Sequence, residues 1–415
     1  MKKLLLIFLL IAAWSVQARA VYPLCDDWLF SFRYENSSDN ARCVTLPHTW
    51  NLDALAGTIP YLRTTADYQR KLYVPQTWTG KRLFLKFYGV ESVAHLFVNG
   101  TYVGEHRGGT TAFVFEITDR VKYGSENLLR VAVSNAITGD VLPLSSIHNI
   151  YGISREVELI VTDPTAVSPL YLGSSGVLIH PRAVSTERAE AEAEIHLISK
   201  GDNFCRVTLE AFDPDGIQAA AKTIKAKLDG KPVVIPFTVE NPRLWDLDHP
   251  NLYRMRVSVE SDTSRDEIEI ATGFRNIRVT PEEGFRLNDS LVRVHGVTLY
   301  YDRPGTGSAM EAEDYAEDFA FIRELGANAL RSPAGPHAPC LYDLCDRTGV
   351  LVWIDLPHLS SATFPIIRTR NSRRTVASNC AKSSPSISTG RQWSSGDSST
   401  ASGNGAKTPC PMCGH

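Results

Sequence analysis

The sequence lacks a strong charge of either sign, and beyond its first residues it lacks any long apolar run. Its 415 residues carry a formal net charge of -3, with a pI near 6.4, so no electrostatic attraction to nucleic acid is expected. After Trp14 no stretch approaches the roughly 20 apolar residues that a membrane helix requires. We therefore predict neither a nucleic-acid partner nor membrane insertion of the mature chain.

Cysteine is scarce, and its placement favours no metal site or cofactor. Cys25 and Cys43 lie near the start of the chain, where a disulfide and two free thiols both remain open. Cys205 and Cys345 are surrounded by apolar residues, which predicts buried thiols. The motif 410–415 offers two cysteines and a histidine, one ligand short of a zinc site.

The N-terminus has the three parts of an export signal. Lys2-Lys3 precedes an apolar run from Leu4 to Trp14, and Ala18-Arg19-Ala20 supplies small residues at the cleavage positions. The run is too short to span a bilayer of roughly 30 Å, so an uncleaved anchor is the weaker alternative. We predict a signal peptide over residues 1–20, a mature chain starting near Val21, and a periplasmic or secreted product.

Short alternating strands divided by turn residues fill the segment from Trp28 to about Thr162. Segments such as Arg82–Phe87 place apolar residues at every second position or in short buried runs, which is typical of an antiparallel β-sandwich. Asn99-Gly100 tolerates positive φ and predicts a two-residue hairpin turn. The first sandwich is assigned to residues 21–166.

A second all-β segment, residues 167–282, has the length and strand spacing of an immunoglobulin-like sandwich. Trp245 lies beside a turn within it. A sugar-stacking role for this ring is one interpretation, and packing in the core or between domains is the favoured one.

After Thr280 the pattern changes to strand-helix alternation. A strand over 291–297, a helix over 312–325, a strand over 327–331, a helix over 340–346 ended by Gly349, and a strand over 350–355 form a β-α-β-α-β series. Its strands are nearly continuous apolar runs, as parallel strands buried on both faces require.

Eight short motifs, in their order and spacing, resemble glycoside hydrolase family 2, the β-galactosidase and β-glucuronidase family, and especially its exported bacterial members. They are Leu46–Asn51, Phe97–Gly100, Val103–Gly109, Asn241–Trp245, Gly273–Arg275, Phe285–Asn288, His295–Val297 and Leu344–Asp346. The resemblance implies a multidomain fold with a jelly-roll β-sandwich of the sugar-binding type, an immunoglobulin-like β-sandwich and a catalytic TIM (β/α)8 barrel. It also implies a carbohydrate partner, a β-galactoside or β-glucuronide, and no cofactor.

The family chemistry implied is a β-galactosidase-like hydrolysis of O-glycosyl bonds with retention, using two carboxylates about 5–5.5 Å apart. In the family these follow the fourth and seventh barrel strands. A whole barrel needs eight strands and about 250 residues, whereas only residues 283–364 read as barrel, with strands 1 to 3. We therefore predict a barrel truncated before both catalytic positions, and an inactive N-terminal fragment.

The tail, residues 365–415, is basic and rich in serine, with Asp397 as its only carboxylate side chain. Such low-complexity composition predicts disorder. Because the change falls inside a folding unit, we interpret the tail as the product of a shifted reading frame.

Four charged residues of the barrel segment are candidates for substrate binding, and no catalytic residue is assigned. Asp302 and Arg303 follow the first strand, Arg331 ends the second and Asp355 ends the third, so all four are expected near one cleft. In the family an arginine at the place of Arg331 can orient a catalytic carboxylate. Salt bridges that close the top of the barrel are the alternative role for each.

Two departures from the family pattern affect specificity. The family usually has His-Tyr-Pro where this sequence has Ala334-Gly335-Pro336, and a histidine where it has Tyr300. The second functional class is a non-catalytic carbohydrate-binding or interaction protein made of two sandwiches. Sugar, linkage and oligomeric state have no signal in the sequence.

Overall fold

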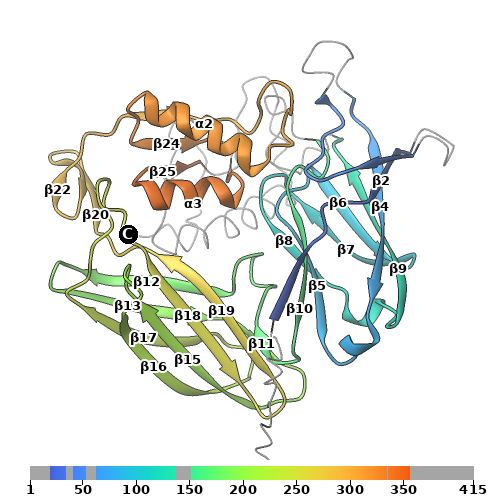
Figure 1. Ribbon diagram of the computed structural model, residues 1–415, viewed down its shortest axis with the longest axis horizontal. Helices are drawn as coiled ribbons and strands as arrows, with labels where there is room; N and C mark the ends of the chain where they lie inside the picture. Colours follow the sequence, from blue (N-terminus) through green and yellow to red (C-terminus); the bar gives the residue numbers. More distant parts are fainter. Residues whose placement is uncertain (1–18, 34–40, 53–61, 137–150, 334, 356–415) are drawn as a thin grey trace, which may run out of the picture.

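The protein consists of two β-sandwiches and a smaller α/β segment, arranged so that the α/β segment touches both sandwiches (Figure 1). The computed structural model describes residues 19–33, 41–52, 62–136, 151–333 and 335–355. Most of the predicted signal peptide and the whole predicted tail fall outside these residues.

The first sandwich has the predicted antiparallel organisation, of jelly-roll type. One sheet has the strand order β1-β10-β5-β8 and the other the order β3-β2-β4-β9-β6-β7. Its strands are β1 (Arg19–Pro23), β2 (Trp28–Phe32), β3 (Arg42–Val44), β4 (Thr65–Val74), β5 (Arg82–Phe87), β6 (Val93–Val98), β7 (Thr101–Arg107), β8 (Phe113–Glu116), β9 (Ser125–Ser134) and β10 (Val157–Thr162). Two short 3-10 helices, η2 (Gln76–Trp78) and η3 (Thr118–Arg120), link strands. The sheets enclose a closed apolar core that includes the fully buried rings of Trp28 and Tyr68.

The predicted hairpin turn joins β6 and β7. Asn99 has φ 51° and Gly100 has φ 79°, the left-handed conformations that a two-residue turn requires. The Asn99 side-chain amide also donates to Oδ1 of Asn127 at 2.8 Å, which fixes the turn against the start of β9.

The second sandwich has the predicted immunoglobulin-like form. Its sheets have the strand orders β12-β13-β17 and β16-β15-β18-β19, with a small pair β11-β14 beside them. The strands are β11 (Ala166–Val167), β12 (Val177–Val184), β13 (Arg188–Ile195), β14 (Leu197–Ile198), β15 (Phe204–Phe212), β16 (Gln218–Lys227), β17 (Val233–Glu240), β18 (Tyr253–Glu260) and β19 (Arg265–Thr272). Alternate residues of β18, from Tyr253 to Val259, are buried, as a sheet with one covered face requires.

A small antiparallel sheet follows, formed by β20 (Ile277–Thr280), β21 (Gly284–Leu287) and β22 (Ser290–Leu291). The predicted domain boundary at 282–283 falls in the turn between β20 and β21. The single strand predicted over 291–297 is wrong: β22 ends at Leu291, and the next strand starts at Gly296. Val294 lies between them and is 46% exposed, so this apolar residue is not part of a buried strand.

The remaining elements form the predicted β-α-β-α-β series of a barrel. The parallel sheet has the order β23-β24-β25, with β23 (Gly296–Thr298), β24 (Ala329–Ser332) and β25 (Leu351–Ile354). Helices α2 (Ala312–Glu324) and α3 (Pro339–Thr348) connect these strands. They lie together beside the sheet (Figure 1).

Both helices have recognisable end signals. Glu311 and Asp314 form a reciprocal capping box at the start of α2. Helix α3 begins at Pro339 and ends at Gly349, which has φ 74° as a left-handed cap. Tyr315, Phe319 and Ile322 form the buried face of α2, whereas Phe321 is 62% exposed.

Trp245 packs between the second sandwich and the barrel segment, as the favoured interpretation expected. The ring is fully buried, and its Nε1 atom donates to the carbonyl oxygen of Asp346 in α3 at 2.7 Å. The Arg275 guanidinium lies 4.6 Å from the ring centre. This indole therefore joins the two parts and does not face a sugar.

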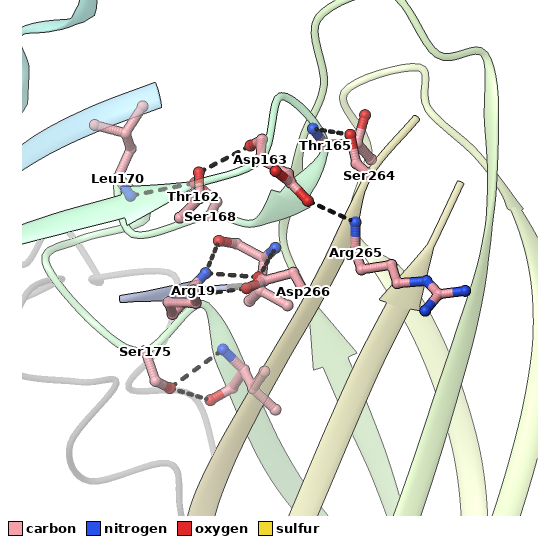
Figure 2. Close-up of polar contacts among 12 residues, drawn as sticks. Arg19, Thr162, Asp163, Thr165, Ser168, Leu170, Ser175, Ser264, Arg265 and Asp266 are labelled. Atoms are coloured by element: carbon pink, nitrogen blue, oxygen red, sulfur yellow. Dashed lines mark hydrogen bonds and ion pairs between the residues drawn. The ribbon is translucent and has the colours of Figure 1, made fainter. Parts of the chain in front are cut away.

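The two sandwiches meet at a polar junction (Figure 2). Arg19 of β1 forms an ion pair with Asp266 of β19 at 2.8 Å. Asp163 accepts from the backbone N–H of Arg265 at 2.9 Å and also pairs with Lys81. Arg19 and Ala20, which the predicted cleavage would remove, are thus part of β1, whereas residues 1–18 lie outside the described residues.

Cys25 and Cys43 form no disulfide with each other, so the pairing left open by the sequence is not present. Cys43 lies opposite Leu29 in the β2–β3 pair, and the Cys25 carbonyl accepts from the N–H of Leu46. Cys205 and Cys345 are buried thiols, as predicted.

Candidate functional site

The carboxyl ends of the three parallel strands bring two of the four candidate residues together. Arg331 lies on β24 and Asp355 directly follows β25, its neighbour in the sheet. The Arg331 Nε and Nη2 atoms donate to the Asp355 carboxylate oxygens at 3.3 and 2.5 Å. Such a two-bond contact fixes the plane of the guanidinium as well as its position.

This pair is open to solvent. The Arg331 side chain is 53% exposed and that of Asp355 20%. Asp355 raises the pKa of Arg331, through their hydrogen bonds first, so the guanidinium is charged at any physiological pH. With two of its five N–H donors directed at Asp355, the guanidinium has donors left for a ligand oxygen.

Hydrogen bonds tie the described residues of the loop after β24 to the segment that follows β23. Tyr301 is buried, and its hydroxyl donates to the carbonyl oxygens of Gly335, at 2.6 Å, and Pro333. His337 Nε2 lies 3.0 Å from the carbonyl oxygen of Leu299, so it also ties the loop to the end of β23. Burial raises the pKa of Tyr301 well above its usual value, which keeps its hydroxyl protonated as a donor.

Arg303, also expected near the cleft, forms ion pairs with helix α2. Its guanidinium contacts three acids of α2, Asp314 at 3.0 Å, Glu317 at 2.9 Å and Asp318 at 3.9 Å. This contact is the salt bridge considered as the alternative role. Asp302, the preceding residue, is half-buried in the segment between β23 and α2. Substrate contact by any of the four residues stays a prediction.

Arg155 docks the first sandwich on the barrel segment, and no expectation from the sequence named it. Arg155 is buried, and its guanidinium donates to the carbonyl oxygens of Thr110 at 2.7 Å, Tyr88 at 3.3 Å and Pro336 at 2.6 Å. Its signal in the sequence is the motif Gly152-Ile153-Ser154-Arg155, which ends in this arginine. Arg155 thereby places the loop after β24.

A cavity of about 80 Å³ lies at this junction, lined in part by Tyr88, Arg155, Met310 and Cys340. Ligand pockets are commonly about 300–1,000 Å³. The cavity is therefore too small for a sugar ring, and the open ends of the parallel strands remain the candidate site.

A buried carboxyl lies near the same edge of the first sandwich. Glu91 is 1% exposed, and its burial raises the pKa to about 8, although Ser92 and the charges of Arg155 and Arg63 oppose this rise. Gly109 packs against it so closely that an added Cβ would lie 1.3 Å from Glu91 Oε2. Glycine at position 109 therefore leaves room for this carboxyl.

No metal cluster and no membrane helix are found in the part of the chain that the structure describes. There, no three His, Cys, Asp or Glu side chains are placed to hold a metal ion. Within those same ranges, none of the helices is long and apolar enough to cross a membrane. The cysteines and histidine of the motif 410–415 lie outside the described residues.

Models of three domains of one family match the chain in the order of its domains. "Glycosyl hydrolases family 2, sugar binding domain" matches residues 30–164, "Glycosyl hydrolases family 2" matches residues 175–275, and "Glycosyl hydrolases family 2, TIM barrel domain" matches residues 277–388. The last match extends past Phe364, where the sequence analysis ended the barrel segment.

Relatives with sequence similarity have glycosidase names. A β-glucuronidase of Bacteroides fragilis is 38% identical over 360 residues, which are 85% of this chain and 52% of the relative. A β-galactosidase of Thermoanaerobacter pseudethanolicus is 28% identical over 351 residues, 80% of this chain and 46% of the relative. The chain thus spans about half the length of these relatives.

The fold is also similar to those of solved glycosidase structures. The crystal structure of a Bacteroides uniformis β-glucuronidase superposes with a TM-score of 0.82 at 28% identity, covering 90% of this chain and 46% of the other. The agreement extends over both sandwiches and the barrel segment, because no smaller part makes up that share of the chain.

Proposed function

The chain belongs to glycoside hydrolase family 2, and from that membership we propose that its domains serve the hydrolysis of a β-glucuronide, with the barrel segment forming part of the sugar cleft. The observation that carries this proposal is the Arg331–Asp355 pair, which is open to solvent where barrel enzymes hold their substrates. Asp355 would accept hydrogen bonds from sugar hydroxyls.

A glucuronide is favoured over the β-galactoside that the sequence analysis emphasised. The β-glucuronidase of Bacteroides fragilis has the higher identity, 38% against 28% for the β-galactosidase. A glucuronide also has a carboxylate where a galactoside has a neutral hydroxymethyl group. The exposed N–H donors of Arg331 suit that carboxylate, or a catalytic carboxylate beside it.

The implied reaction is hydrolysis with retention, in which a protonated carboxyl assists the leaving group and an ionised one attacks the sugar. Asp355 contacts Arg331, and this charge-assisted contact suits a binding role. Downstream of Phe364 the sequence has one carboxylate side chain, Asp397. We therefore propose that residues 1–415 on their own bind the sugar without cleaving the glycosidic bond.

We also propose export to the periplasm or the medium. Lys2-Lys3, the apolar run from Leu4 to Trp14 and the small residues after it support this location. Large polysaccharide and conjugated glucuronides do not cross membranes freely, so an exported protein would meet such substrates directly.

The test combines turnover with binding. The purified chain is incubated with p-nitrophenyl β-D-glucuronide and with the matching β-galactoside, and calorimetry measures the binding of glucuronate and galactose. We expect glucuronate to bind at least about tenfold more tightly than galactose, and no nitrophenol to be released. Release that a mechanism-based glycosidase inhibitor abolishes would contradict the proposal of binding without cleavage, and equal affinities would contradict the choice of sugar.

A variant separates the two functional classes. Arg331→Gln should weaken glucuronate binding about tenfold or more, because the neutral amide cannot pair with a carboxylate. If binding is unchanged in this variant, the sugar site lies on the sandwiches, and the chain acts as a carbohydrate-binding protein of the second class.

A further inference from the structure

The Asp266 carboxylate is buried and depends on Arg19 for its compensating charge. The Arg19 Nε atom donates to Oδ1 of Asp266 at 3.0 Å and its Nη2 atom donates to Oδ2 at 2.8 Å. The Asp266 side chain is 0% exposed and that of Arg19 11%. Besides this cation, Asp266 accepts from the N–H of Val167 at 2.8 Å (Figure 2). Removal of Arg19 would leave a buried carboxylate with no cation against it.

The backbone of Arg19 is also part of the folded sandwich. In the β1–β10 pair Arg19 lies opposite Thr162 and Ala20 opposite Val161. Thr162 is fully buried, so this end of β1 covers the sheet beside the second sandwich. The Arg19 Nη2 atom further donates to the carbonyl oxygen of Val167 at 2.5 Å. A chain that started at Val21 would lose these contacts together.

The sequence offers two places where a leader can be cleaved. Leader peptidases require small side chains at the first and third positions before the cut. Ala18 and Ala20 meet this requirement for a cut after Ala20, which is the position predicted from the sequence. Val16 and Ala18, a small aliphatic residue and alanine, meet it for a cut after Ala18. The small-residue pattern does not distinguish the two positions, whereas the fold does.

We propose that a leader peptidase cuts between Ala18 and Arg19, so that Arg19 is the first residue of the mature protein. Hydrolysis adds one water across this amide, leaving a carboxylate on Ala18 of the leader and an ammonium group on Arg19. The cut keeps the whole of β1 and the ion pair with Asp266. The inference rests on the export proposed above, and it replaces Val21 as the mature start.

The experiment reads the N-terminus of the exported chain. The full chain with a C-terminal tag is expressed in a Gram-negative host, isolated from the periplasm under denaturing conditions, and analysed by intact mass and N-terminal sequencing. We expect a single form that starts at Arg19. A form starting at Val21 would overturn the cleavage position while leaving export intact. Retention of Met1, with the chain in the cytoplasm, would overturn export and processing together.

Two matched variants locate the cut independently. Ala20→Leu places a large side chain at the second residue after the proposed cut, so at least about nine-tenths of the exported chain should still start at Arg19. If the cut instead follows Ala20, the same variant blocks it and the processed fraction falls about tenfold or more. Ala18→Leu should block processing for either cut and serves as the positive control. Because the readout is the N-terminus of denatured protein, it does not depend on how stably each variant folds.

Discussion

The sandwiches and the barrel segment cover the apolar faces of their sheets in different ways. Each sandwich closes a core from its own strands, which are joined mostly by short antiparallel connections. In the described barrel segment the parallel sheet is three strands wide, and α2 keeps Phe321 and Leu325 at 62% and 75% exposure. Antiparallel hairpins complete a core locally, whereas parallel strands need crossovers and neighbours from far along the chain.

The barrel segment compensates by using the sandwiches as neighbours. Trp245 of the second sandwich shares a buried cluster with Leu287, Ala329 and Leu351, which come from the strands next to it. Arg155 of the first sandwich holds the loop after β24 at Pro336. The barrel segment therefore depends on both sandwiches for its order. Four variants test how the sandwiches and the barrel segment are held together, from the largest expected effect to the smallest.

Trp245→Ala should give the largest loss of stability, about 3–5 kcal/mol, because it empties a fully buried site and removes the hydrogen bond to Asp346. Chemical denaturation measures the loss. Limited proteolysis should show residues 284–355 cut first, with a resistant fragment ending near Thr280. Trp78→Ala, at a half-buried ring of the first sandwich, is the control. In this variant the order in which the protease cuts the segments should be the same as in the wild-type chain. Equal protection of the barrel segment in the Trp245 variant would show that it folds independently.

Arg19→Gln should cost about 3 kcal/mol at neutral pH, because the buried Asp266 carboxylate loses its cation. Burial already raises the pKa of Asp266, and loss of Arg19 should raise it further. A carboxyl with a raised folded pKa loses stability as the pH rises through that value, so the deficit should shrink toward pH 4.

The double variant Arg19→Gln with Asp266→Asn should recover most of the stability lost by the single change. Urea denaturation of the two variants at pH 4 and pH 7 measures both effects. If the double variant is as unstable as the single one, the ion pair is not the source of the loss.

Glu91→Gln tests whether the first sandwich tolerates its buried carboxyl only in the protonated form. The folded pKa of about 8 lies above the ordinary 4.5, so the unfolded chain ionises first as the pH rises from about 5 to 8. The wild-type chain should lose stability over this window, and the glutamine variant should not.

We expect Glu91→Gln to gain about 2 kcal/mol relative to wild type between pH 5 and pH 8, less than the full shift would give because the surroundings relax. Thermal unfolding at several pH values measures this difference. Glu126→Gln is the matched control, since that side chain is 62% exposed. A parallel pH dependence in all three chains would assign the effect to other groups.

Asp355→Asn should have the smallest effect on stability, within about 1 kcal/mol, because its partner Arg331 is largely exposed. Glucuronate binding should nevertheless weaken about tenfold, since Asp355 orients the guanidinium. Arg303→Gln provides the contrast: its guanidinium already pairs with acids of α2, so binding should weaken less than in Asp355→Asn. Denaturation and calorimetry on both variants measure the separation. A large loss of stability from Asp355→Asn would give that pair a structural role instead.

Local patterns in the sequence predicted most elements, and contacts between distant segments account for what was missed. The Asn99-Gly100 turn and the Gly349 cap follow from backbone preferences, so they were predictable from single residues. The strand expected over 291–297 failed because Val294 faces solvent next to β23, where only three residues pair. Periodicity alone could not show this.

The candidate site was also predicted in part from the sequence. Arg331 and Asp355 were both expected at one end of the barrel sheet, and they contact each other because the ends of adjacent parallel strands lie side by side. The ion pairs of Arg303 with α2 were considered only as an alternative, because no local motif of the sequence encodes the turn that directs this side chain to α2. Arg155 and Glu91 depend on packing between β10, the 108–110 bend and the barrel loop, and these segments are distant in sequence.

Within the described residues, Arg155 docks the barrel loop through hydrogen bonds to main-chain carbonyl groups, and this has a consequence for sequence divergence. A carbonyl accepts a hydrogen bond whatever side chain its residue has, so positions 88, 110 and 336 can change without loss of these bonds. Position 155 is constrained by its chemistry and position 89 by its size, since a Cβ at Gly89 would come within 2.9 Å of Arg155 Cδ. We expect substitutions to accumulate freely around this contact while one arginine and one glycine persist, so that the docking of the barrel loop on the first sandwich can outlast most of the sequence identity between relatives.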